Sequence, residues 1–263
     1  MTRTTGGSHR HERVSFEGHA GMLSGNLQIP GEDVKGGVVL SHCFTCSKSL
    51  KTTRSLSTGI EDGGYAVLRY DFTGLGESAG DFADTNVTTN VADIVAAASY
   101  LERRGLRPCA LVGHSLGGAA TLLAAPALPS VPAVAAIAAP FTPQHVRRLF
   151  SEADVERALS EGRIGVRIAG RRFEISAEFF RDLERHCTPD RIAELGRPLL
   201  VIHGTSDAIV GIAEGERIFD AAKQPRWFAA IPGADHLFVQ ERHARQVSRA
   251  IVNFLDTVLD RGP

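Results

Sequence analysis

Short runs of apolar residues recur along the chain, and segments with helical spacing separate most of them. The runs are bounded by glycine, proline or polar residues, which predicts buried β-strands; they lie at 37–41, 65–72, 131–139, 198–202 and 226–231. The helical segments lie at about 50–62, 87–104, 212–223 and 237–259. Because strands that alternate with helices pair in parallel, this pattern predicts an α/β fold with a mostly parallel central sheet and helices on both faces.

The first residues of the chain follow a different pattern. Residues 1–11 are polar, and we expect them to be disordered. Apolar and polar side chains then alternate over 14–16 and 23–29, on either side of the glycine-rich segment 18–21. This period of two predicts an antiparallel hairpin at the edge of the sheet, in a single domain that covers residues 12–263.

The alternation of strand and helix stops over about 141–195. Within this segment the spacing predicts a helix at 151–160, a hairpin at 163–175 around Gly170 and a helix at 176–185. We expect an insertion that forms a small lid over the functional site. Its aromatic side chains are expected to form the core of the lid more often than to contact a substrate; they are Phe141, Phe150, Phe179 and Phe180.

Composition excludes several classes of function. Lys and Arg number 29 against 30 Asp and Glu, a net charge of −1, and without a basic run the chain is not expected to bind nucleic acid or a membrane. The amino terminus lacks the apolar core of a signal peptide, so we expect a cytoplasmic protein. Gly74 and Gly76 lack a third glycine at the spacing of a dinucleotide-binding loop. We therefore expect no cofactor and no metal, and a small-molecule substrate.

Residues 108–126 predict a buried strand, a sharp corner and a helix, with Ser115 at the corner. Gly113 and Gly117 flank the serine in a Gly-x-Ser-x-Gly pattern, where neighbouring strand and helix leave little room for Cβ atoms. This is the context of a nucleophile elbow. The amide of Leu116, at the start of the helix, is expected to supply one half of an oxyanion hole.

A serine hydroxyl needs a base to remove its proton and an acid to orient that base. Asp207 follows the strand at 198–202, and His236 follows the strand at 226–231. The order Ser115, Asp207, His236 predicts a catalytic triad on a parallel sheet. Two other aspartates remain open as the acid; they are Asp93 and Asp235.

Three further histidines flank the predicted site loops, and we expect them to pack or form hydrogen bonds; they are His42, His114 and His203. The second oxyanion donor is expected from the loop after 37–41, at the amide of Phe44. Cys43 and Cys46 flank it, and three interpretations stay open: small apolar fillers, a redox device or metal ligands.

All four cysteines of the chain are expected to be reduced thiols; they are Cys43, Cys46, Cys109 and Cys187. If the first two closed a disulfide, we expect the loop to move and the amide of Phe44 with it, so that oxidation would lower the activity.

These motifs resemble the serine α/β-hydrolase superfamily over about residues 12–260. The segments that carry the resemblance are Asp-Phe-Thr-Gly-Leu-Gly-Glu-Ser at 71–78, Gly-His-Ser-Leu-Gly-Gly at 113–118, Ser-Asp at 206–207 and Gly-Ala-Asp-His at 233–236. More narrowly, His-Cys-Phe-Thr-Cys-Ser-Lys at 42–48 and Val-Gly-Ile at 210–212 are similar to the hydrolase half of proteins fused to an OsmC-type peroxide-reducing domain, here without that domain. The resemblance implies an α/β-hydrolase fold and carboxylic-ester hydrolysis by Ser115, Asp207 and His236, with oxyanion amides at Phe44 and Leu116.

Other activities fit part of this pattern. Thioesterases, amidases, acyltransferases and cofactor-free haloperoxidases use the same triad, so the sequence leaves them open as alternatives. A catalytically silent binding module would have lost a triad residue, and none is lost. A thiol-redox protein using Cys43 and Cys46 is the alternative outside hydrolysis. Oligomeric state and physiological substrate are not predicted.

Overall fold

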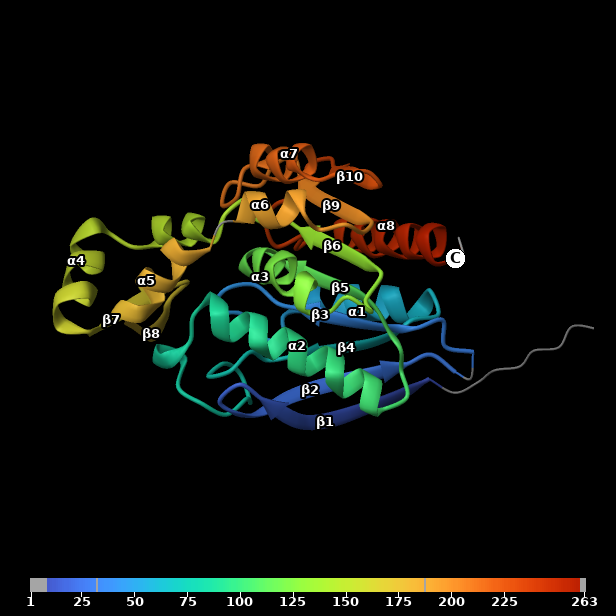
Figure 1. The fold of residues 1–263 in the computed structure, drawn as a ribbon, viewed down its shortest axis with the longest axis horizontal. Coiled ribbons are helices and arrows are strands. Elements are labelled where there is room, and N and C mark those ends of the chain that lie inside the picture. The colour runs from blue at the N-terminus through green and yellow to red at the C-terminus, as the bar shows by residue number, and fades with distance from the viewer. Residues whose placement is uncertain (1–8, 32, 187, 261–263) are drawn as a thin grey trace, which may run out of the picture.

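The structure is a computed structural model that describes residues 9–31, 33–186 and 188–260. Its centre is an eight-stranded sheet in the order β1-β2-β4-β3-β5-β6-β9-β10 (Figure 1). The strands are β1 (Arg10–Gly18), β2 (Gly21–Ile29), β3 (Gly37–Ser41), β4 (Ala66–Tyr70), β5 (Pro108–His114), β6 (Ala133–Ile137), β9 (Leu199–Gly204) and β10 (Arg226–Ile231). β1 and β2 run antiparallel to each other and β2 runs antiparallel to β4, whereas the remaining neighbours are parallel. The expected sheet, with its antiparallel amino-terminal hairpin, is confirmed.

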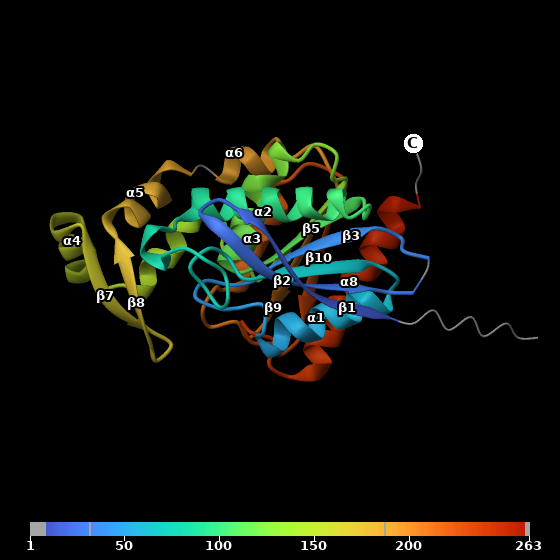
Figure 2. The ribbon, with the colours of Figure 1, turned by 90° about the horizontal axis from the view of Figure 1, so that it is seen from below.

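Helices cover both faces of the sheet, as Figure 2 shows for α2 and α1. The helices that pack on the sheet are α1 (Lys51–Asp62), α2 (Val87–Arg103), α3 (Leu116–Ala124), α7 (Ile212–Ala221) and α8 (Glu241–Leu259). Successive residues of a strand serve the two sides: Val38 and Leu40 pack with α1 and α8, and Val39 packs with α2 and α3. Because both faces are buried, the strands read as continuous apolar runs rather than as alternating ones.

An insertion between β6 and β9 projects from one end of the molecule (Figure 1). It contains a 3₁₀ helix (Pro143–Leu149), α4 (Glu152–Glu161), β7 (Arg163–Ile168), β8 (Arg171–Ser176), α5 (Ala177–Arg185) and α6 (Thr188–Ala193). α4, β7, β8 and α5 match the expected helix, hairpin and helix, whereas the 3₁₀ helix and α6 are additional. Phe150, Phe179 and Phe180 form a separate apolar cluster that also includes Leu116 of α3. Phe141 instead packs near the main core, with Arg217 over its ring.

The prediction that residues 1–11 are disordered is wrong for the last residues of this range. Arg10 and His11 belong to β1, where they pair with Ile29 and Gln28, because the hairpin register continues to the last residue of β2. Residues 1–8 lie outside the described part of the chain. None of the described helices combines the length and the apolar character that crossing a bilayer requires. The cytoplasmic location stays a prediction.

Candidate active site

Ser115 lies at a sharp turn between β5 and α3. Its backbone has φ 57° and ψ −126°, a conformation that non-glycine residues adopt only when the surrounding structure holds them there. The amide of Ser115 donates to the carbonyl of Ile137 at 2.8 Å. A Cβ on Gly113 would collide with the carbonyl of Gly117, and a Cβ on Gly117 would collide with the carbonyl of His42. The two glycines thus allow the close packing of strand, helix and neighbouring loop that aims the serine out of the sheet.

The structure brings together the three residues that the sequence proposes as a triad. His236 Nε2 lies 3.0 Å from Ser115 Oγ, and His236 Nδ1 lies 2.7 Å from Asp207 Oδ2. A carboxylate can only accept, so Nδ1 carries a proton and donates it to Asp207. Nε2 is then free to accept the proton of the serine hydroxyl. All three residues are buried, with 8–9% of their surface exposed.

Asp207 follows β9 and keeps its negative charge. Its Oδ1 accepts hydrogen bonds from the amides of Ile209 (2.9 Å) and Val210 (2.8 Å). Burial alone would raise the pKa of Asp207, but the imidazoles of His203 and His236 and the Val210 amide act in the opposite direction and hold this pKa well below its usual range. The aspartate is therefore a fixed carboxylate behind the imidazole.

As expected, His114 and His203 form hydrogen bonds to the backbone, and neither is placed as a second base. His114 Nε2 donates to the backbone carbonyl of His236 at 2.8 Å, and His203 Nε2 donates to the carbonyl of Val210 at 2.7 Å. Burial, together with the neighbouring charge of His236, lowers the pKa of His114 to about 3, so this ring is neutral. The two rings hold the backbone of the segments that carry His236 and Asp207.

The other candidate acids have different partners. Asp93 accepts hydrogen bonds from the amides of His19 and Thr73 and from the Thr73 hydroxyl. Asp235 accepts from the amide of Val239 at 3.1 Å. Only Asp207, among the described acidic residues, contacts the ring of His236.

Phe44 lies in the loop after β3, between Cys43 and Cys46. These two cysteines form a disulfide with 5.3 Å between their Cα atoms, so the expectation of reduced thiols is wrong for this pair. The reason is a tight turn: the amide of Cys46 donates to the carbonyl of Cys43, which brings the two residues within bridging range. Cys109 is a free thiol whose pKa burial raises to about 12, and Cys187 lies outside the described residues.

Two sets of contacts fix this loop: the hydrogen bonds of His42, a residue expected to form them, and the ion pairs of Lys48, which were not expected. His42 Nε2 accepts from the amide of Phe72, so Nδ1 carries the proton and donates to the carbonyl of Cys43. The ammonium of Lys48 is buried and pairs with Asp71 at 2.5 Å and with Glu77 at 2.7 Å. The sequence signal was present, since these residues belong to the two segments at 42–48 and 71–78, but their pairing depends on the tertiary structure.

A cavity of about 60 Å³ opens beside Ser115. Its lining is mostly apolar and comes from the loop after β3, the elbow, the insertion and the loop after Asp207; it includes Phe44, Leu116, Val146, Leu149, Ile209 and Val210. Phe44 stacks on Phe179 of α5 with 5.4 Å between ring centres, and it contacts Phe150 at 6.4 Å. The insertion therefore contacts the loop that carries the expected oxyanion donor.

The described residues include one group able to hold a metal, His9, His11 and Glu61, at the amino-terminal edge of the sheet and away from Ser115.

The model of the Alpha/beta hydrolase family matches residues 38–250. The chain belongs to this family. It is 35% identical to the esterase domain of a Rhodothermus marinus protein, with a TM-score of 0.77 over 95% of this chain and 99% of that one. Est1E from Butyrivibrio proteoclasticus, solved with ferulic acid, has a TM-score of 0.79 over 91% of this chain and 96% of that one; at 19% identity it shows the fold alone.

Two of the curated relatives match over shorter stretches. Human ABHD12B is 29% identical over 67% of this chain, and the mouse mitochondrial palmitoyl-protein thioesterase ABHD10 is 29% identical over 62% of it. The alignments span 46% and 55% of those relatives, so the chain spans about half of their length.

Proposed function

We propose that the protein is a serine hydrolase that cleaves carboxylic esters of small molecules through an acyl-enzyme. The observation that carries the proposal is the hydrogen-bonded series from Ser115 through His236 to Asp207, built on a turn with positive φ. The likeness to an esterase domain at 35% identity supports the choice of an ester substrate.

In this mechanism Ser115 Oγ attacks the ester carbonyl while His236 Nε2 takes the hydroxyl proton. The tetrahedral intermediate collapses, the bond to the alcohol breaks, and the alcohol leaves with the proton held by His236. A water molecule then repeats the attack on the acyl group, again with His236 as base, and releases the acid and the free serine. Asp207 stabilises the imidazolium in both steps because its carboxylate stays charged.

The amides of Phe44 and Leu116 are proposed to bind the oxyanion. Leu116 is the first residue of α3, where amides have no partner within the helix and the dipole favours negative charge. Among the described backbone hydrogen bonds outside helices and strands, none has the amide of Phe44 or of Leu116 as its donor. Both residues also line the cavity beside Ser115.

The insertion at 141–195 is proposed to act as a lid that sets substrate preference. Val146 and Leu149 of its 3₁₀ helix line the cavity, and the aromatic cluster around Phe179 closes the space behind Phe44. Because the apolar cavity is small, we expect short acyl chains to fit better than long ones. A long-chain thioester, suggested by the name of the mouse relative, is therefore the less favoured substrate.

The test combines turnover with covalent labelling. We expect the protein to hydrolyse p-nitrophenyl acetate and butyrate faster than the octanoate, and Ser115→Ala to lose this activity by at least about a thousandfold because the nucleophile is gone. A fluorophosphonate probe should add one mass increment to the parent and none to Ser115→Ala.

Ser160→Ala, which changes an exposed serine on α4, is the matched control and should behave as the parent. Wild-type turnover or labelling in a clean Ser115→Ala preparation would overturn the proposal. Faster turnover of palmitoyl-CoA than of any ester would move the substrate to thioesters.

A further inference from the structure

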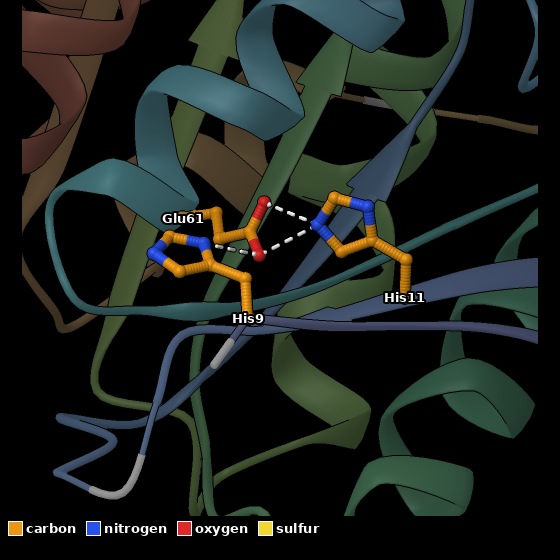
Figure 3. A group of neighbouring side chains, drawn as sticks. All are labelled: His9, His11 and Glu61. Carbon is orange, nitrogen blue, oxygen red and sulfur yellow. Dashed lines mark hydrogen bonds and ion pairs between the residues drawn. The ribbon is translucent and has the colours of Figure 1, made fainter. Parts of the chain in front are cut away.

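Two histidines at the start of the chain's first strand face a glutamate of α1 (Figure 3). His9 directly precedes β1 and His11 belongs to it, so the two side chains project on the same side of the strand. His9 Nδ1 lies 3.0 Å from Glu61 Oε1, and His11 Nε2 lies 2.8 Å from Oε1 and 3.0 Å from Oε2. One potential ligand atom from each of the three residues lies within 4.8 Å of the other two.

Glu61 places a carboxylate where negative charge is unfavourable. Its side chain is 1% exposed, and it lies in the last turn of α1, at the negative end of the helix dipole. Gln28, directly opposite His11 in the hairpin, donates to Oε2 at 2.7 Å but brings no charge. Among the ion pairs of the described residues, Glu61 has only His9 and His11 as partners. A cation between the imidazoles and the carboxylate would add positive charge next to Glu61, where the only other described cation in the network is Arg69, which reaches it through Gln28.

The three side chains match the ligands that a divalent transition metal uses. Zn²⁺ binds imidazole nitrogen and carboxylate oxygen at about 2.0–2.2 Å, so neighbouring ligand atoms of a tetrahedral ion lie roughly 3.3 Å apart. The contacts of 2.8–3.0 Å between the histidines and Glu61 are close to this spacing. His9 and His11 are 51% and 60% exposed and can adjust by side-chain rotation, whereas Gln28 keeps the carboxylate in place.

We propose that His9, His11 and Glu61 bind a divalent transition-metal ion of the zinc class, with water completing its coordination. The ion fixes β1, which among the described strands pairs only with β2 at the edge of the sheet, to a helix about 50 residues away. His11 lies opposite Gln28, which pairs with Val67 near the start of β4, whereas Ser115 follows the end of β5. The metal therefore stabilises the fold and takes no part in catalysis.

The experiment uses the full chain without a polyhistidine tag, after chelation and dialysis. Calorimetric titration with ZnCl₂ should show one ion bound per chain through these ligands. At free Zn²⁺ a hundred times above the Kd, the Tm should rise by roughly 5 to 10 °C. Mg²⁺ at the same concentration should leave the Tm unchanged, because it prefers oxygen ligands and keeps its water.

The double variant His9→Ala/His11→Ala should keep ester hydrolysis and lose the Zn²⁺-dependent rise in Tm. His19→Ala removes an exposed histidine at the turn of the same hairpin and should retain the full rise. An equal rise in the double variant would place the ion elsewhere and overturn the proposal. So would the absence of Zn²⁺ binding in the parent, which would leave the cluster as a histidine–glutamate ion pair.

Discussion

The carboxyl ends of the parallel strands, here called the carboxyl edge of the sheet, carry histidine beside a carboxylate. The opposite ends, here called the amino edge, do so too, but the two places hold these groups differently. At the carboxyl edge His236 and Asp207 are both buried, and each has a fixed partner on its far side. At the amino edge His9 and His11 are more than half exposed, and only Glu61 is buried. The first arrangement suits proton transfer between set positions. The second suits a ligand that enters from solvent and draws mobile side chains around it.

Backbone support explains the difference. Ser115 and Asp207 follow the interior strands β5 and β9. His236 follows β10, which is an edge strand, but its carbonyl accepts a hydrogen bond from His114 of β5, so the backbone is held at all three positions. β1 is an edge strand with one neighbour, and its first residues lie beside α1 without a second strand to hold them. Preorganisation of the candidate active site can therefore be tested by loosening it step by step.

The largest expected effect comes from Asp207→Asn. An amide in place of the carboxylate can donate to His236 Nδ1 and so favours the tautomer in which Nε2 carries the proton and cannot accept from Ser115. We expect kcat for p-nitrophenyl butyrate to fall by about 10⁴ with little change in Tm. Steady-state kinetics and thermal melting of the same preparation measure both.

Asp235→Asn is the control for this change, because its carboxylate accepts from the backbone amide of Val239 and, among the described residues, not from His236. It should reduce kcat by less than about tenfold. If Asp235→Asn were the crippling variant and Asp207→Asn the mild one, the assignment of the acid would be wrong.

The residues at the carboxyl edge could be predicted from the sequence because their sequence neighbours mark each of them. Ser115 has its flanking glycines, and Asp207 and His236 each follow an apolar run that predicts a strand. The amino edge gives no such signal, since His11 meets Glu61 only through the register of the hairpin and the packing of α1. The pairing of Lys48 with Asp71 likewise depends on loop contacts that periodicity does not encode. Cys43 and Cys46 could be recognised as a possible pair, but whether they form a bridge depends on the turn between them.

A smaller effect, on stability, is expected from His114. Burial lowers its pKa to about 3, below the value of about 6.5 in the unfolded chain. Between these values the unfolded state binds more protons, so the free energy of unfolding falls as the pH falls below 6.5. From pH 7 to pH 5 this group alone should cost about 2 kcal/mol. His114→Gln, which keeps a donor for the His236 carbonyl, should lose that part of the pH dependence.

Urea unfolding at pH 7 and pH 5 measures the difference for the parent and for His114→Gln. His19→Gln, at an exposed position, serves as the control and should keep the parental dependence. Identical pH dependence in the parent and His114→Gln would show that the ring behind His236 is not held neutral, and that this edge is less rigid than its contacts indicate.

The smallest effect is expected from the disulfide, and here we expect the opposite direction from the one that the sequence suggested. The bridge between Cys43 and Cys46 coexists with Phe44 lining the cavity beside Ser115, so we expect the oxidised loop to be the more active one. Reduction would remove the disulfide, while the contacts of His42, Lys48 and Asp71 would continue to hold the loop. Loss of a whole oxyanion donor costs about 10²–10³ in kcat, and a loosened donor should cost only a small part of that, roughly threefold.

Ester hydrolysis before and after dithiothreitol, followed by reoxidation, measures this effect. The double variant Cys43→Ser/Cys46→Ser should start near the activity of the reduced parent and should not respond to reductant. Cys109→Ser is the matched control, because this buried thiol is free and its removal should leave the response of the parent unchanged. A parent that gains activity on reduction would mean that the bridge holds the Phe44 amide away from its working position. Equal activity in all states would mean that the contacts of His42 and Lys48 alone fix the loop.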